Sequence, residues 1–143
     1  MKILQAGAVA IGGRAILIEG APGSGKSTLA LGLIDRGAQL IGDDGTTLLE
    51  RGGWLWAAPP PSTAGLIEIR NVGLVELPVT TAPVALFLRL DEAAPRFRDD
   101  ADTRSFGSFA APLVTLDPRL PALPLRAEYA LRQFGLAASR TAT

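Results

Sequence analysis

A glycine-rich segment near the N-terminus limits the choice of folds more than any other part of the sequence. Residues 20–27 read G-A-P-G-S-G-K-S and match in full the phosphate-binding pattern G-x-x-x-x-G-K-[ST], the P-loop. A hydrophobic run from Ala15 to Ile18 precedes it. The stretch from Lys26 to Arg36 follows, with apolar residues spaced as on one face of a helix. This order of strand, loop and helix predicts an α/β domain built around the loop.

The residue types in this loop suit the phosphates of a nucleotide. Its glycines let successive backbone N–H groups point at phosphate oxygens, and the start of the following helix adds partial positive charge. Lys26, one of only two lysines in the chain, would contact the β- and γ-phosphates, and the Ser27 hydroxyl would bind Mg²⁺. Thr28 has either a phosphate-binding role or only extends the helix start. The predicted nucleotide-binding residues here are Gly20, Ala21, Pro22, Gly23, Ser24, Gly25, Lys26, Ser27 and Thr28.

The composition of the chain excludes several catalytic groups and one class of partner. The chain has no cysteine and no histidine, which excludes disulfides, thiolate metal sites and imidazole catalysis. Proton transfer would fall to carboxylates, lysines, tyrosine or water. The net charge is zero, with 14 basic and 14 acidic residues, so there is no electrostatic footprint for nucleic acid.

The length of 143 residues suits one domain, which we expect at 1–137 with a frayed tail at 138–143. The N-terminus lacks the apolar core of a signal peptide. No stretch approaches the ~20 apolar residues of a membrane helix. We therefore expect a soluble cytoplasmic protein with no membrane or nucleic-acid partner.

Hydrophobic periodicity predicts a chain rich in strands with two helices. The segment from Asp91 to Gly107 mixes charge, proline and glycine and is expected to be a long surface loop, in which Arg96, Arg98 and Arg104 could contact a substrate or phosphate. The predicted helices are 26–36 and a closing helix from Leu123 to Phe134. The predicted strands are 8–11, 15–18, 39–42, 46–49, 54–56, 66–70, 84–90 and 113–116.

Two groups of charged residues accompany the loop. Asp43 and Asp44 follow the predicted strand 39–42, which we expect beside the strand that enters the P-loop, where ligands of α/β sheets gather. One carboxylate could hold Mg²⁺ and the other accept a proton; the alternative is a solvated turn. Glu68 and Arg70 are two apart on a predicted strand and so share a face, with Ile67 and Ile69 on the buried face. The alternative for this pair is an ion pair on a wet surface.

With these pieces in order, the chain resembles the catalytic, C-terminal domain of HPr kinase/phosphorylase. The resemblance rests on residues 20–28, 33–44 and 65–73. It implies a compact α/β P-loop fold of the HPr kinase and phosphoenolpyruvate carboxykinase-like type, a mixed sheet with few helices. It also implies a short, single-domain form like that known in alphaproteobacteria, and assembly into homo-oligomers, specifically hexamers.

The same resemblance implies an ATP- and Mg²⁺-dependent protein serine kinase. Its substrate would be HPr, the phosphocarrier of the sugar phosphotransferase system, and the reverse reaction would dephosphorylate that serine with inorganic phosphate. Asp43 and Lys26 would be catalytic and Arg70 would contact phosphate. The Mg²⁺ ligands would be Ser27, Asp44 and Glu68.

Four positions depart from the family pattern. Gln5 stands where the family has a histidine near the catalytic aspartate, and Thr28 where it has an acidic residue. Ala38 stands where the family has the histidine of a Gly-His pair, and Asn71 where it has a glycine. The missing histidine and the changed acidic position keep open an ATP-binding regulator or pseudokinase with a different protein partner.

A small-molecule kinase also stays open, with the segment from Asp91 to Gly107 as its arginine-bearing lid. A GTPase is disfavoured, because a chain whose only lysines are Lys2 and Lys26 has no Asn-Lys-x-Asp motif.

Overall fold

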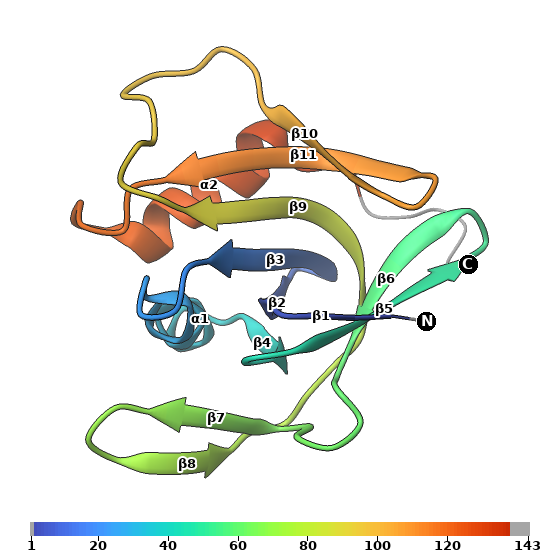
Figure 1. Ribbon diagram of the computed structural model, residues 1–143, viewed down its shortest axis with the longest axis vertical. Helices are drawn as coiled ribbons and strands as arrows, with labels where there is room; N and C mark the ends of the chain where they lie inside the picture. The colour runs from blue at the N-terminus through green and yellow to red at the C-terminus, as the bar shows by residue number, and fades with distance from the viewer. Residues whose placement is uncertain (1, 138–143) are drawn as a thin grey trace.

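The computed structural model describes residues 2–137, so the predicted tail at 138–143 lies outside the described residues. The described part is mostly sheet with two helices, as expected of a mixed α/β domain (Figure 1). No helix in residues 2–137 is both long and apolar enough to cross a bilayer. In chain order the elements are β1 (Lys2–Leu4), β2 (Gly7–Ile11), β3 (Arg14–Gly20), α1 (Lys26–Asp35), β4 (Gln39–Gly42), β5 (Thr46–Arg51), β6 (Trp54–Ala58), β7 (Leu66–Ile69), β8 (Gly73–Glu76), β9 (Ala82–Leu90), β10 (Asp102–Phe106), β11 (Phe109–Leu116) and α2 (Leu123–Phe134).

The centre of the sheet positions the P-loop. β2 and β3 form an antiparallel hairpin, whose turn requires the positive φ angles of Gly12 (58°) and Gly13 (82°). β3 then pairs in parallel with β9, and β9 in parallel with β11. Figure 1 shows these three strands side by side and pointing the same way. The carboxyl ends of the three strands therefore lie at the same end of the sheet, and the P-loop leaves β3 there.

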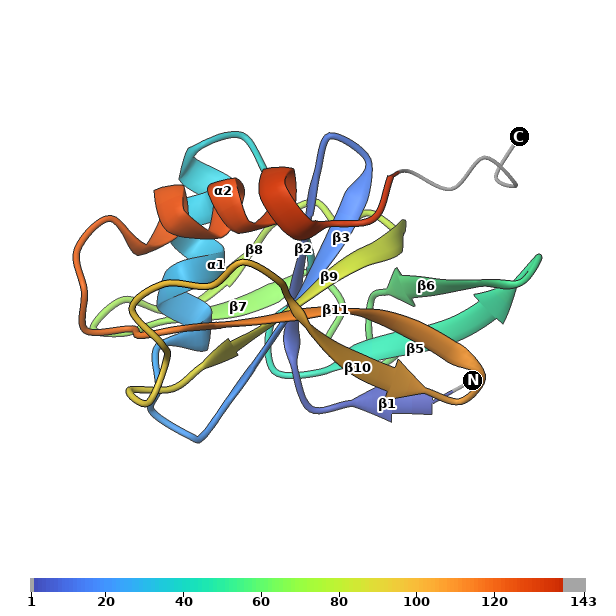
Figure 2. The same cartoon turned by 90° about the horizontal axis from the view of Figure 1, so that it is seen from above.

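Successive side chains of the central strands point to opposite faces of the sheet, so the core has two layers. Ile16 and Ile18 of β3 face the helices, where they pack with Leu29 and Leu33 of α1 and residues of α2. Leu17 faces the opposite layer, which β5, β6 and β11 help to enclose. Figure 2 shows both helices over the same side of the sheet. Each fully buried aliphatic side chain of this kind contributes about 1.5–3 kcal/mol to folding.

A two-stranded hairpin of β7 and β8 lies apart from the main sheet, beyond α1 and β4 in Figure 1. Ile67 is fully buried and anchors it, whereas Val72 and Leu74 near its tip are exposed. The predicted alternation of this strand is confirmed at its centre, since Glu68 is exposed between buried Ile67 and half-buried Ile69.

The structure corrects several sequence-based expectations. The segment from Asp91 to Gly107 is not loop throughout, because residues 102–106 form β10 and pair with β11. β4 does not adjoin the P-loop strand: β2 lies between β3 and β4. β1 and β8 are strands that the sequence pattern did not reveal, as both are short and mostly exposed. The other predicted elements are present with shifts of a few residues at their ends.

Candidate phosphate-binding and catalytic site

The P-loop connects β3 to α1 with a backbone that only glycine adopts easily. Gly23 has φ 78° and Gly25 has φ 104°, both in the left-handed region. Gly25 is the N-cap of α1, and no side chain caps the helix. The first N–H groups of α1 therefore keep their capacity to bind an anion at a helix end of partial positive charge.

Two side chains of the loop are arranged as donors to a phosphate group. The Lys26 ammonium folds back over the loop and donates to the carbonyl oxygens of Gly20 (2.7 Å) and Ala21 (3.2 Å). The Ser24 hydroxyl is buried without a hydrogen-bond partner among residues 2–137. A buried donor of this kind costs free energy unless a ligand satisfies it. The loop therefore fits the phosphates of a nucleotide.

The structure brings Asp43 to the P-loop although β4 and β3 are not neighbours. Ser27 Oγ donates a hydrogen bond of 2.7 Å to Asp43 Oδ1. The backbone N–H of Glu68 donates to Asp43 Oδ2 at 3.2 Å. Both carboxylate oxygens therefore accept a hydrogen bond, and Asp43 connects the start of α1, the end of β4 and β7.

The remaining predicted residues lie around this centre. Asp44, Glu68 and Thr28 are exposed, and Arg70 is exposed immediately after β7 ends. Within residues 2–137 no three acidic side chains cluster closely enough to hold a metal ion by themselves. Mg²⁺ commonly binds through one or two carboxylates together with substrate phosphates, so the hard oxygens beside the loop are compatible with that ion. The ligand set of Ser27, Asp44 and Glu68 stays a prediction.

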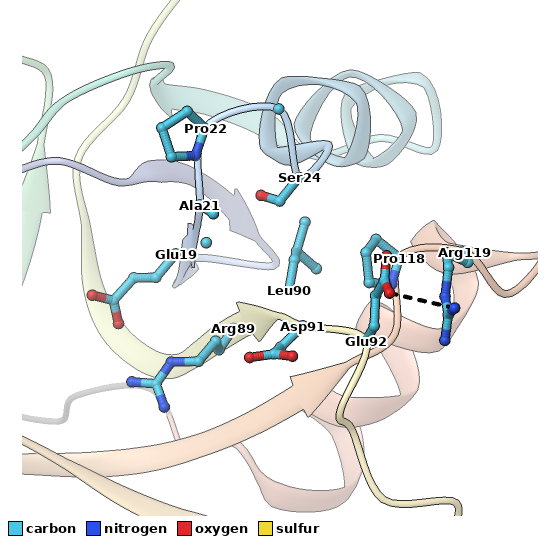
Figure 3. A pocket seen from close by; sticks show the side chains of 12 residues that line it. Glu19, Ala21, Pro22, Ser24, Arg89, Leu90, Asp91, Glu92, Pro118 and Arg119 are labelled. Carbon is cyan, nitrogen blue, oxygen red and sulfur yellow. Dashed lines mark ion pairs between the residues drawn. The ribbon is translucent and has the colours of Figure 1, made fainter.

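A cleft of about 740 Å³ opens on the other side of the P-loop (Figure 3). No sequence motif marks the residues that line this cleft after β9 and β11, although Asp91 directly follows a predicted strand. The rule that ligands gather at carboxyl ends of strands could have found them. Beyond the P-loop itself, the lining residues are Glu19, Arg89, Leu90, Asp91, Glu92, Pro118 and Arg119.

Arg104, which the sequence suggests as a contact for substrate or phosphate, instead forms an ion pair with Glu19 of β3, the strand that enters the P-loop. Its guanidinium makes two hydrogen bonds to the Glu19 carboxylate, at 3.0 and 2.9 Å. These bonds raise the pKa of Arg104. Both side chains are largely buried, with 25% of Arg104 and 17% of Glu19 exposed. The pair therefore ties β10 to the strand that carries the P-loop.

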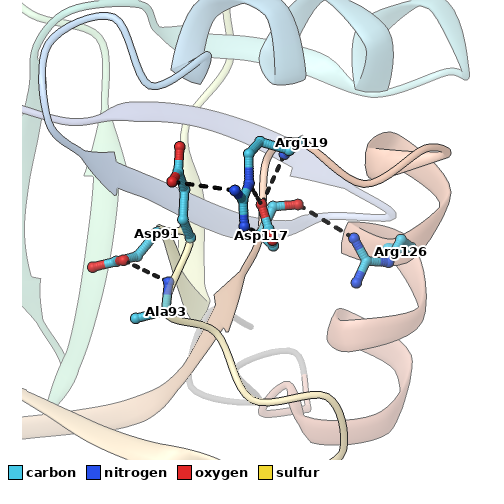
Figure 4. A network of polar contacts seen from close by, with 6 residues as sticks. Asp91, Ala93, Asp117, Arg119 and Arg126 are labelled. Atoms are coloured by element: carbon cyan, nitrogen blue, oxygen red, sulfur yellow. Dashed lines mark hydrogen bonds and ion pairs between the residues drawn. The ribbon is translucent and has the colours of Figure 1, made fainter.

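A second network fixes the turn after β11 (Figure 4). The Arg119 guanidinium donates to Asp117 at 3.1 and 2.9 Å, and the Arg119 N–H donates to the same carboxylate at 2.9 Å. The side-chain bond, followed by the backbone bond, lowers the pKa of Asp117 from its ordinary value of 3.8. Arg126 of α2 donates to the Asp117 carbonyl at 3.4 Å, and Arg119 also pairs with Glu92 at 3.4 Å.

Together, the fold and the site define a P-loop domain of mixed α/β type with a carboxylate at the phosphate-binding loop. The family model of the HPr serine kinase C-terminal domain matches residues 2–81, more than half of the chain. The chain belongs to this family.

Individual relatives agree with this assignment. The chain is 42% identical over 69 residues to an HPr kinase/phosphorylase of Clostridium botulinum (strain Eklund 17B) and 41% identical over 70 residues to that of Clostridium acetobutylicum. These matches cover 48% and 49% of the chain, and the chain spans only 23% of each relative. A solved structure, the Hpr(Ser) kinase/phosphatase from Coxiella burnetii, aligns with a TM-score of 0.81 and 29% identity, covering 92% of this chain and 89% of that one.

Proposed function

We propose that this chain is an ATP- and Mg²⁺-dependent serine kinase of the HPr kinase/phosphorylase type, with HPr as its protein substrate. The observation that carries the proposal is the hydrogen bond of 2.7 Å between Ser27 and Asp43. It places a carboxylate beside the hydroxyl that a P-loop uses for its metal ion. Membership of the HPr serine kinase family supports the choice of a protein hydroxyl as acceptor.

In the proposed reaction, Asp43 accepts the proton of the substrate serine. The serine oxygen forms a bond to the γ-phosphorus as the bond from that phosphorus to the β-γ bridging oxygen breaks, and ADP leaves. A positioned general base of this kind accelerates such a step by about 10²–10⁴-fold. Asp43 is already oriented for the task, because Ser27 and the Glu68 N–H fix both of its oxygens.

The P-loop residues 20–28 would hold the phosphates. Lys26 would exchange its bonds to two loop carbonyls for bonds to phosphate oxygens, and Arg70 would add a second cation from the end of β7. Ser27, Asp44 and Glu68 would hold the metal ion, which when bound neutralises charge on the transferred phosphoryl group. The Ser24 hydroxyl would gain the hydrogen-bond partner that it lacks within residues 2–137.

Further properties belong to the same proposal. In the reverse direction Asp43 would return the proton to the serine oxygen as phosphate attacks phosphoserine and pyrophosphate is released. Gln5, which stands in place of the family histidine, cannot take up a proton in support of that step. We also propose that the chain assembles as a hexamer, as the family resemblance implies, and that it acts in the cytoplasm.

The test is phosphoryl transfer to HPr from the same organism. The purified chain is incubated with γ-labelled ATP, Mg²⁺ and HPr, and mass spectrometry locates the modified residue. We expect phosphoserine on HPr, and a rate at least ~100-fold lower for Asp43→Asn. Asp35→Asn, an exposed aspartate at the end of α1, is the matched control and should leave the rate unchanged.

Other results would contradict the proposal. Stabilisation by ATP without transfer to any protein would favour an ATP-binding regulator. Consumption of ATP with a small metabolite but not with HPr would favour a small-molecule kinase. An unaltered rate in Asp43→Asn would remove Asp43 as the base.

A further inference from the structure

The cleft beside the P-loop lies on the side away from Asp43. In the main sheet β3 pairs with β2 on one side and with β9 on the other. β4 lies beyond β2, and Asp43 directly follows β4. The cleft is built from the ends of β9 and β11, as Figure 3 shows, with Leu90 and Asp91 near its centre and Pro118 and Arg119 on its far side. The P-loop therefore separates the proposed site of phosphoryl transfer from this cleft.

The direction of a bound nucleotide follows from that separation, and this step rests on the proposed function. If Asp43 receives the proton of the attacking serine, the γ-phosphate must face Asp43. The chain of phosphates then runs along the loop away from Asp43, and the nucleoside must leave on the opposite side. Inorganic phosphates, in contrast, need only the loop.

We propose that the cleft between the P-loop and the carboxyl ends of β9 and β11 is the nucleoside subsite, which takes the base and ribose of the triphosphate held by the loop. Its volume of about 740 Å³ is within the range of about 300–1,000 Å³ for small-molecule sites. Its walls belong to three parallel strands whose carboxyl ends meet there, the usual place for a ligand in such sheets.

The side chains of the far wall suit a flat base. Arg119 is held in one orientation by Asp117 and Glu92, yet 60% of its side chain stays exposed, so a face of the guanidinium is available for stacking. Pro118 next to it adds an apolar surface. Because Asp117 is itself buried, the arginine is pre-organised before a ligand arrives.

The side chains at the floor suit a ribose. Asp91 Oδ1 accepts a hydrogen bond of 2.8 Å from the Ala93 N–H, which orients the carboxylate at the end of β9. Among residues 2–137 its Oδ2 has no partner, and it can accept from a sugar hydroxyl, as acidic residues do in dinucleotide-binding folds. The cleft thus offers an acceptor for the sugar and a stacking surface for the base.

Binding measurements on the full chain test this assignment with two ligands, ATP and inorganic tripolyphosphate, both with Mg²⁺. Arg119→Ala should weaken ATP binding about tenfold, since stacking on a base contributes that much, and should leave tripolyphosphate binding unchanged. Arg132→Ala, an exposed α2 arginine over the ring of Tyr129, is the control and should change neither. An equal effect of Arg119→Ala on both ligands, or none on ATP, would overturn the subsite.

A second measurement needs no substitution. Photolabelling of the unaltered chain with 2-azido-ATP, followed by trypsin digestion, should mark the peptides 90–96 and 105–119, which carry Asp91 and Arg119. Labelling confined to peptides 37–51 or 52–70, on the side of Asp43, would overturn the subsite. If the unaltered chain failed to bind even tripolyphosphate, the phosphate site of the proposed function would itself be wrong.

Discussion

Ser27 and Asp43 are joined by a hydrogen bond of 2.7 Å between Oγ and Oδ1, although they are 16 positions apart, with Ser27 in the first turn of α1 and Asp43 directly after β4. The bond links the start of α1 to the end of β4, at the level of the first residues of β2. It fixes the Ser27 hydroxyl and the Asp43 carboxylate, the proposed base, relative to each other. Because the Glu68 N–H donates to the same carboxylate, Asp43 also connects the β7–β8 hairpin to the phosphate-binding loop.

Removing the Lys26 ammonium should weaken nucleotide binding with little effect on folding. Lys26→Ala removes a charged donor to phosphate, and such bonds contribute about 1.5–3 kcal/mol, so ATP should bind roughly 10–100-fold more weakly. Isothermal titration with ATP and Mg²⁺ measures the effect. The chain supplies its own control in Lys2→Ala, the only other lysine, which lies on β1 and should leave ATP affinity unchanged.

Position 71 should tolerate glycine but not a β-branched residue. Asn71 has φ 69° in the turn between β7 and β8, a left-handed conformation that glycine adopts freely and asparagine better than most residues. This explains how asparagine can replace the glycine that the family resemblance implies here. Asn71→Gly should leave the free energy of unfolding almost unchanged in urea denaturation, and Asn71→Val should lower it by about 1–2 kcal/mol. Equal stabilities of the two variants would contradict this account of the turn.

The ion pair of Glu19 and Arg104 should stabilise the fold. Both side chains are largely buried and joined by two charge-assisted bonds, so removing one partner leaves a charge without compensation. We expect a double-mutant cycle with Glu19→Gln and Arg104→Met, followed by urea denaturation, to give a coupling free energy of about 1–3 kcal/mol. Strictly additive effects of the two substitutions would show that the pair contributes nothing.

Asp117 should make stability depend on pH in the acid range. Its pKa is lower in the folded chain than the ordinary value of 3.8, because Arg119 hydrogen-bonds the charged form. The unfolded chain then binds the proton more readily, so this contribution is complete above pH 3.8 and is lost as pH falls through the lower folded pKa. Asp117→Asn should therefore be less stable than the unaltered chain at neutral pH, and the difference should shrink in urea denaturations below pH 3.8. A constant difference across that range would contradict the assignment.

The sequence pattern and the folded structure differ most clearly at β10. β10 lies in the segment from Asp91 to Gly107, whose mixture of charge, proline and glycine predicts a loop. Of its five residues only Phe106 is apolar, and it packs against the core. Its strand conformation comes from pairing with β11 and from the contact of Arg104 with Glu19. Such partners are remote in sequence and leave no local pattern of hydrophobic residues.

The prediction that β4 adjoins the P-loop strand is also wrong. The order of elements along the chain favoured β4 beside β3, but the tight turn at Gly12 and Gly13 folds β2 onto β3 first and occupies that edge. Asp43 still reaches Ser27, since β4 pairs with β2 and ends at the level of the loop.

The P-loop can be predicted from the sequence alone, because its chemistry is local. Consecutive backbone N–H groups, left-handed glycines and the start of one helix lie within eight residues and need no distant partner. Two relations become visible only in the folded chain: which carboxylate contacts Ser27, and which strand ends form the cleft beyond the loop. Those relations depend on the order of strands in the sheet and on close packing between distant segments, which are set by the burial of the whole core rather than by the spacing of residues.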